Sequence, residues 1–195
     1  MIIGITGGIG SGKSAVSSYL KKKGFKIVDA DKESRNVTKK GSPALKAIAE
    51  EFGADMLDKR GALKRKKLGA VVFTDKAKLE RLKEITTGEI LKRCLAAIEA
   101  EQNKHPGKHI VFDVPLMFES GWNKYCDRVW TVSCKEEIRI GRVVARDGLS
   151  EDAVKNRIAN QATDSDREAK ADFVIRNEGT LEDLYLTIEN KLSSI

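Results

Sequence analysis

The sequence has few of the residues that mark several classes of protein. Among 195 residues, proline occurs 3 times and cysteine 3 times, whereas hydrophobic residues make up 41%. This composition excludes a disordered or proline-rich chain. A chain of this length can bury ~70% of its unfolded surface, so it needs no disulfide scaffold. Because Cys94, Cys126 and Cys134 form no C-x-x-C pair, we expect buried, unpaired thiols in a reducing compartment.

Long apolar runs are absent as well. No stretch approaches the ~18 apolar residues that span a bilayer. The apolar start at residues 1–8 lacks a basic region and soon becomes glycine-rich, unlike a signal peptide. We therefore expect a cytoplasmic protein without membrane association. The two histidines, His105 and His109, flank a Pro-Gly break, which leaves no histidine–carboxylate metal cluster and no convincing Ser–His nucleophile pair.

Positive charge is in excess. Lys and Arg total 36 and Asp and Glu 29, a formal net charge of +7. Nucleic acid, an anionic membrane and a small polyanionic ligand are all compatible with this excess. The sharpest basic runs, 21–23 and 64–67, are interpreted as solvated helix faces, with contact to substrate phosphates as an alternative for the second. Neither run has interleaved aromatic residues, so we do not expect nucleic-acid binding.

Short apolar segments alternate with helical patterns along the chain. Strands are predicted at 1–6, 25–28, 110–113, 128–132 and 173–175. Helices are predicted at 14–23, 43–52, 64–102, 135–146, 151–161 and from 180 onward. The last helix is expected to bury a stripe made of Leu181, Leu184, Ile188 and Leu192. This order predicts an α/β fold with a doubly wound, five-stranded parallel sheet. We expect one domain over 1–195 with helical insertions at about 60–104 and 139–170.

The segment Gly7–Ser14 matches the phosphate-binding pattern G-x-x-x-x-G-K-[ST]. Glycines let the backbone curl so that its N–H groups face a phosphate, and the following helix directs its positive end toward the same anion. The pattern predicts a nucleoside triphosphate site made by Gly8, Ile9, Gly10, Ser11, Gly12, Lys13, Ser14 and Ala15. Lys13 would bridge the β- and γ-phosphates, and the Ser14 hydroxyl would ligate Mg²⁺. A dinucleotide-binding turn is the alternative, but its G-x-G-x-x-G spacing does not fit.

Carboxylates follow two of the predicted strands. Asp29 and Asp31 come after the second strand, and Asp113 ends the third. Ligands of such sheets lie beyond the carboxyl ends of the strands, so we expect these acids near the glycine-rich turn. One of the first two would accept a proton from the substrate, with a simple helix N-cap as the alternative. Asp113 is a candidate for approaching Mg²⁺ through water. No Asn-Lys-x-Asp motif is present, so guanine specificity is not expected.

An ordered set of motifs resembles the dephospho-CoA kinase family over nearly the whole chain. It comprises Gly4–Ser14, Val28–Asp31 with Arg35, Val114–Glu119, Arg142 with Arg146-Asp147, Arg157 with Gln161, and Ala171–Asn177. The resemblance implies a three-layer P-loop kinase fold with a helical substrate-binding insertion and a lid. It also implies ATP-dependent phosphorylation of the ribose 3′-hydroxyl of dephospho-coenzyme A, the last step of coenzyme A synthesis. Another small-metabolite or nucleoside monophosphate kinase is the alternative, and a nucleotide-dependent nucleic-acid-binding module is a third.

The resemblance also implies residue roles. Asp31 matches the second Asp of the family's D-x-D and is the candidate general base. The acceptor would contact Asp29, Asp31, Arg35, Pro115, Leu116 and Glu119. Arg142 and Arg146 would close over the phosphates, and Arg139 is expected on the same helix face. We expect a monomer or a weak homo-oligomer.

Two departures from the family pattern stand out. The stretch Leu82–Gly88 lacks the usual His-Pro, and Arg139 stands where the family often has Gln. These differences concern acceptor binding and lid closure.

Overall fold

The computed structural model describes all residues, 1–195, and groups them into two compact units. Residues 1–28 and 101–195 make the first unit, and residues 29–100 make the second. Each unit is described by itself. No helix in the structure combines the length and the apolar character needed to cross a membrane.

The first unit is built on a five-stranded sheet in the order β2-β3-β1-β4-β5. The strands are β1 (Ile2–Gly7), β2 (Lys26–Asp29), β3 (Ile110–Asp113), β4 (Arg128–Ser133) and β5 (Phe173–Arg176). β1 pairs in parallel with β3 and β4, and β4 pairs in parallel with β5. Every residue of β3 is buried, as expected for a parallel strand covered on both faces. The predicted α/β fold and all five predicted strands are confirmed.

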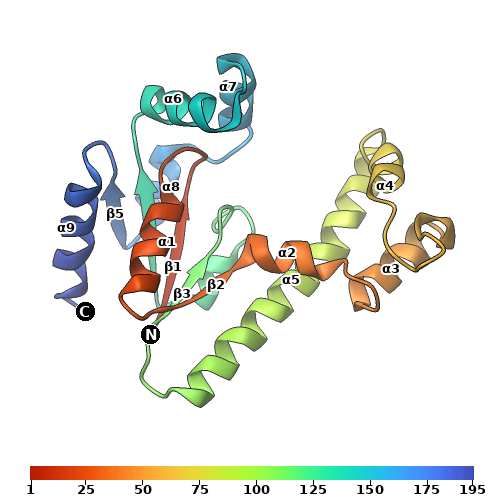
Figure 1. Cartoon of the computed structure of the whole chain (residues 1–195), viewed down its shortest axis with the longest axis horizontal. Coiled ribbons are helices and arrows are strands. Elements are labelled where there is room, and N and C mark those ends of the chain that lie inside the picture. The colour runs from red at the N-terminus through yellow and green to blue at the C-terminus, as the bar shows by residue number, and fades with distance from the viewer. The chain divides into compact units, whose positions relative to one another are not determined.

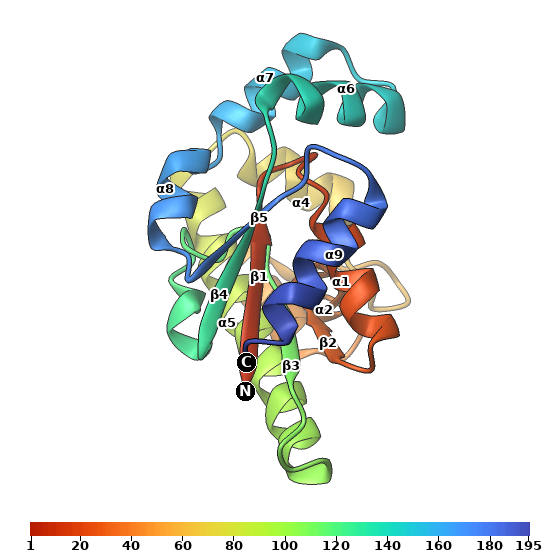
Figure 2. The same ribbon diagram turned by 90° about the vertical axis from the view of Figure 1, so that its left-hand side faces the viewer.

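Helices cover the sheet and extend beyond one end of it. α1 (Lys13–Lys22) and α9 (Leu181–Leu192) pack on one face, where Val16, Leu20, Leu184 and Ile188 join the core residues of the strands. α8 (Asp164–Lys170) lies on the opposite side (Figure 2). α6 (Glu136–Asp147) and α7 (Glu151–Ala159) lie beyond the carboxyl end of β4 (Figure 1).

The stripe predicted on the last helix is only partly correct. Leu184 and Ile188 are buried, and Leu192 packs at the edge of the core. Leu181, however, is 53% exposed, so its predicted burial is wrong. It is the first residue of α9, directly after the capping box formed by Thr180 and Asp183. The capping box fixes the start of α9, and at this first position the apolar face of the helix does not yet contact the sheet.

The second unit is helical and has a small core of its own. It contains α2 (Ala30–Val37), α3 (Pro43–Phe52), the short 3-10 helix η1 (Ala54–Met56), α4 (Arg65–Val72) and most of α5 (Lys76–Lys104). Ile48, Met56, Leu68 and Val72 form the buried core. The unit begins at residue 29, before the insertion of about 60–104 expected from sequence, because α2 and α3 pack with these helices. Whether the chain behaves as one domain stays a prediction.

Candidate active site

The glycine-rich turn connects β1 to α1 and leaves the start of the helix without a side-chain cap. Gly12 is the N-cap of α1, with φ at 96°, and it offers no side-chain oxygen to the first turn of the helix. A Cβ atom at Gly12 would collide with the Asn177 amide, so only glycine fits. The uncapped amides at the start of α1 and the positive end of its dipole are the features that bind phosphate.

Asp113, the last residue of β3, binds two side chains from the start of α1. Its carboxylate, which is 5% exposed, forms an ion pair with Lys13. The Ser17 hydroxyl donates a hydrogen bond of 2.6 Å to the same carboxylate. The structure therefore places Lys13 and Asp113 together, as the sequence predicts, and adds Ser17. Ser14 lies on the exposed side of the first turn of α1.

Ile9, near the middle of the glycine-rich turn, is held on three sides. The guanidinium Nε of Arg139 donates to the Ile9 carbonyl at 2.9 Å. The Ile9 N–H donates to Oε1 of Gln161 at 3.0 Å. Its side chain packs against the small apolar cluster of α6 and α7 that contains Val143 and Val154. The segment beyond the sheet is thus attached directly to the turn.

Two buried arginines share one carboxylate beside the same turn. Arg139 and Arg167 are 1% and 2% exposed, and both form ion pairs with Asp164. Their guanidinium groups cover Gly8 so closely that a Cβ there would lie 2.5 Å from Arg139 and 2.7 Å from Arg167. The sequence spacing puts Arg139 on the helix face of Arg142 and Arg146, but Arg139 differs from both in being buried. Its side chain is already engaged by Asp164 and the Ile9 carbonyl.

Arg142 and Arg146 lie on successive turns of α6 and have different surroundings. Nη1 of Arg142 is 3.5 Å from the Ser11 carbonyl, at the glycine-rich turn. Arg146 instead binds both carboxylate oxygens of Asp147, at 2.7 and 2.9 Å. This hydrogen bonding raises the pKa of Arg146 and lowers the pKa of Asp147. The structure brings Arg142 to the loop and leaves Arg146 in an exposed pair.

The segment after β3 carries three residues expected to contact the acceptor. The Pro115 carbonyl accepts a hydrogen bond of 3.1 Å from the Thr6 hydroxyl. Leu116 is 46% exposed. Glu119 accepts a hydrogen bond of 3.1 Å from the Ala162 N–H, so it also holds the segment that precedes α8. Their contact with a substrate stays a prediction.

The acids expected on the acceptor side belong to the second unit. Asp29 is the N-cap of α2, and its carboxylate accepts a hydrogen bond of 3.0 Å from the Lys32 N–H. The N-cap alternative is thus confirmed for Asp29. Asp31 follows on the first turn of α2 with an exposed side chain, and Arg35 lies on its last turn. An ion pair of 2.8 Å between Glu33 and Arg93 fastens α2 to α5.

Four residues that hold the glycine-rich turn had no role assigned from sequence. Asn177 donates 2.7 Å to the Ser11 carbonyl, and Gln161 accepts from Ile9. Both occur in the motifs that resemble the kinase family, which is the signal that points to them. Asp164 and Arg167 lie in a charged segment without any motif, and only the fold shows that they form an ion pair in which Arg167 is buried.

Comparison with known proteins identifies the family. The family model for dephospho-CoA kinase matches residues 1–183. A dephospho-CoA kinase from Fusobacterium nucleatum is 42% identical over 195 residues, covering 100% of this chain and 98% of the relative. The crystal structure of TT1252 from Thermus thermophilus has a TM-score of 0.80 at 30% identity and covers 100% of this chain and 97% of that one. A dephospho-CoA kinase structure from Campylobacter jejuni has a TM-score of 0.73 at 26% identity, covering 99% and 97%. The chain therefore belongs to the dephospho-CoA kinase family.

Proposed function

We propose that this chain transfers the γ-phosphoryl group of ATP to the ribose 3′-hydroxyl of dephospho-coenzyme A, giving ADP and coenzyme A. The bond between the γ-phosphorus and the bridging oxygen breaks, and a bond from phosphorus to the 3′-oxygen forms. The 3′-hydroxyl proton leaves with a base. The strongest support from the structure is the open glycine-rich turn with Lys13 beside Asp113, in a chain of this family.

The residues of the first unit supply the ATP side of the proposed reaction. The amides of Gly8–Ala15 and the amino group of Lys13 would hold the β- and γ-phosphates. Asp113 keeps the Lys13 side chain oriented until the phosphates arrive. Arg142, already at the turn, and Arg146, once released from Asp147, would add positive charge around the transferring group.

Mg²⁺ fits the oxygen atoms near the turn. The structure contains no group of three or more His, Cys, Asp or Glu side chains that could hold a metal ion by themselves. This suits Mg²⁺, which usually takes one or two protein oxygens, several waters and the phosphates of the nucleotide. The Ser14 hydroxyl would hold the ion directly, and Asp113 would reach it through water. The ion would neutralise charge on the phosphates during transfer.

On the acceptor side, Asp31 is the proposed general base. Phosphoryl transfer depends mainly on positioning and charge stabilisation, so a carboxylate of ordinary basicity can accept the 3′-hydroxyl proton. Asp29, Arg35 and the segment Pro115–Glu119 are the proposed acceptor contacts. The proposed location is the cytoplasm, because all three cysteines are free thiols. A monomer or weak homo-oligomer stays our expectation.

The proposal is tested by incubating the protein with ATP, Mg²⁺ and dephospho-coenzyme A and analysing the product by mass spectrometry. A product phosphorylated at the 3′-position is expected, and a panel of nucleoside monophosphates and small alcohols tests the alternative kinases. Asp31→Asn should lower kcat by ~10²–10⁴-fold without weakening ATP binding. Asp55→Asn, an exposed carboxylate of the same unit, is the control and should change neither. Near-normal turnover by Asp31→Asn would refute the base assignment.

A further inference from the structure

The segment 160–163, between α7 and α8, contacts two different parts of the site. The Gln161 side chain accepts a hydrogen bond of 3.0 Å from the Ile9 N–H, in the glycine-rich turn. The N–H of the next residue, Ala162, donates a hydrogen bond of 3.1 Å to the Glu119 carboxylate, in the segment after β3. This second hydrogen bond is charge-assisted and therefore stronger than one between neutral groups. Neither hydrogen bond has a part in the phosphoryl transfer proposed above.

A single peptide unit separates these two contacts. The Gln161 side chain leaves the backbone at one end of the unit, and the Ala162 N–H belongs to the unit itself. A peptide unit is planar and resists rotation about its C–N bond, so its two ends move together. The backbone of Ile9 is thus joined to the Glu119 carboxylate through the rotatable bonds of one side chain and a rigid plane. A displacement of one contact therefore shifts the other.

A second connection joins the same two parts of the site. Asp113, at the start of the segment after β3, forms an ion pair with Lys13, at the end of the turn. Glu119, at the far end of the segment, is connected to Ile9 through the peptide unit. The turn and the segment are therefore attached to each other at both ends, and the attachments close a ring. A closed ring resists any change in one part that the other part does not follow.

The turn side of the ring would respond to a bound phosphate. Ile9 lies within Gly8–Ala15, whose amides are proposed to face the nucleotide. The Ile9 N–H is engaged by Gln161 at 3.0 Å and its carbonyl by Arg139 at 2.9 Å. A phosphate that orders the turn would therefore also order Gln161 without touching it. The ordered Gln161 would in turn fix the backbone that binds Glu119, on the side where the acceptor is proposed to bind.

We infer that Glu119 and Gln161 are positioning residues that couple the binding of ATP to the binding of the acceptor. The inference rests on the proposed function, in which ATP occupies the turn and the acceptor contacts the segment after β3. It assigns the Glu119 carboxylate to the Ala162 N–H and leaves contact with the substrate to the rest of the segment. Because binding equilibria are reciprocal, each ligand should raise the affinity for the other by the same factor.

The test measures this coupling factor by calorimetry. The dissociation constants of β,γ-imido-ATP with Mg²⁺ and of dephospho-coenzyme A are determined for each ligand alone and with the other ligand saturating. In the unmodified protein we expect each ligand to tighten the binding of the other about tenfold. Glu119→Ala and Gln161→Ala should each reduce the factor below about twofold, and should change the affinity for either ligand alone by less than about threefold. The double variant should lose no more coupling than either single variant, because both residues act in one chain of contacts.

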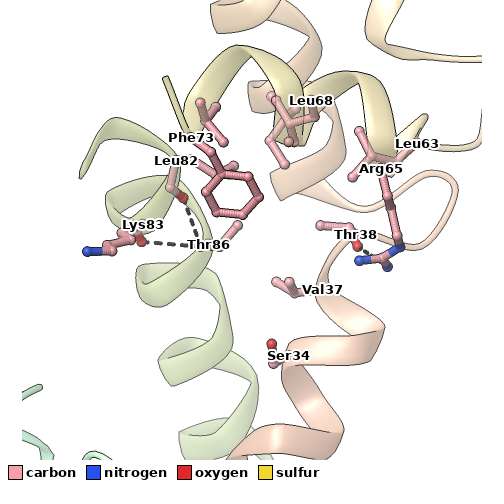
Figure 3. Close-up of a pocket in the computed structure, with 13 residues that line it drawn as sticks. Ser34, Val37, Thr38, Leu63, Arg65, Leu68, Phe73, Leu82, Lys83 and Thr86 are labelled. Carbon is pink, nitrogen blue, oxygen red and sulfur yellow. Dashed lines mark hydrogen bonds between the residues drawn. The ribbon is translucent and has the colours of Figure 1, made fainter. Parts of the chain in front are cut away.

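Three further variants separate positioning from other effects. Glu119→Gln retains an oxygen that can accept from the Ala162 N–H, so it should keep part of the coupling that Glu119→Ala loses. Glu151→Ala removes a surface carboxylate of α7 and should leave the coupling factor unchanged. Phe73 lines a pocket of the helical unit (Figure 3) and is 78% exposed. Phe73→Ala truncates this exposed side chain of the other unit and should also leave the factor unchanged.

Each contrary outcome has a defined consequence. Absence of coupling in the unmodified protein, or unchanged coupling in Glu119→Ala, would overturn the inference and leave the proposed function in place. A large loss of affinity for the acceptor alone in Glu119→Ala, with the coupling retained, would overturn it in favour of direct contact between Glu119 and the substrate. A lower Tm with the coupling retained would show that the hydrogen bonds serve the fold alone. Failure of the unmodified protein to form a phosphorylated product would refute the proposed function, and the inference with it.

Discussion

Asp164 lies between two buried guanidinium groups, and its replacement by Asn is expected to destabilise the fold strongly. Asp164→Asn preserves the shape of the side chain but leaves Arg139 and Arg167, at 1% and 3% side-chain exposure, without a counter-ion. Removing one partner of a buried pair costs about 3–5 kcal/mol. Asp164 itself is 31% exposed, so water compensates part of the loss and we expect ~3 kcal/mol.

Urea unfolding measures this change directly. A loss of ~3 kcal/mol in the free energy of unfolding corresponds to a fall in Tm of about 6–12 °C for a chain of this size. Glu151→Gln provides the control, because Glu151 pairs with Lys155 at 3.8 Å on the surface of α7 and both side chains are more than half exposed. That variant should lose no more than ~0.5 kcal/mol. A loss below about 1 kcal/mol for Asp164→Asn would refute the energetic argument.

The same variant also tests whether the ion pairs position the nucleotide. Arg139 holds the Ile9 carbonyl, so a guanidinium freed from Asp164 should loosen the turn and raise KM for ATP about tenfold. KM for the acceptor should change less than KM for ATP. Loss of stability with an unchanged KM for ATP would show that the pairs serve the fold alone.

Two further predictions concern packing and the cysteines. Gly4→Ala would place a Cβ 2.7 Å from the Cys126 sulfur and 2.9 Å from the end of Met117. This overlap should lower the free energy of unfolding in urea by about 1–3 kcal/mol, and adding Cys126→Ala should restore part of the lost stability. An unchanged unfolding midpoint would show that the neighbouring side chains move freely. Burial raises the pKa of Cys94 and of Cys126 from 9.0 to about 12. Because the folded-state pKa is raised, the stability linked to these thiols is complete below pH 9 and is lost as the pH rises toward 12. A thiol reagent at pH 8 should label the buried Cys94 only as fast as the protein opens, and labelling of Cys94 at the rate of an exposed thiol would contradict its burial.

The sheet and the phosphate turn were predictable from sequence because their signals are local. Each strand is a short apolar run, and the turn needs glycines and Lys13 at fixed spacing. The helices α2 and α8 were not predicted as separate elements, for a physical reason. α8 has the sequence DSDREAK, and its one buried residue is Arg167, so a search for apolar periodicity cannot find it. α2 buries only Ala30 and Val37.

The residues of the candidate site were likewise predictable from sequence only in part. Lys13 and Asp113 follow from motif and strand ends, and the structure places them together. Arg139 has the spacing of a lid arginine, and sequence spacing places it on the face of Arg142 and Arg146. Its actual position depends on Asp164, which is 25 residues away along the chain. The contact joins two helices that are far apart along the chain and leaves no local sequence pattern, so the burial of Arg139 could be seen only in the fold.

The proposed polyphosphate offers a functional reason for the ionic character of the contact with Gly8 and Ile9. Two guanidinium groups and one carboxylate leave one net positive charge buried beside the turn. An apolar contact could hold the backbone as firmly, and buried ion pairs are often no more stabilising than well-packed apolar residues. An apolar contact would not, however, attract an anion. In a site of reduced water access, a fixed positive charge acts more strongly on phosphates than it would in water. If the turn binds a polyphosphate as proposed, the two arginines would add to the positive potential at the anion without contacting it, in addition to their contribution to stability.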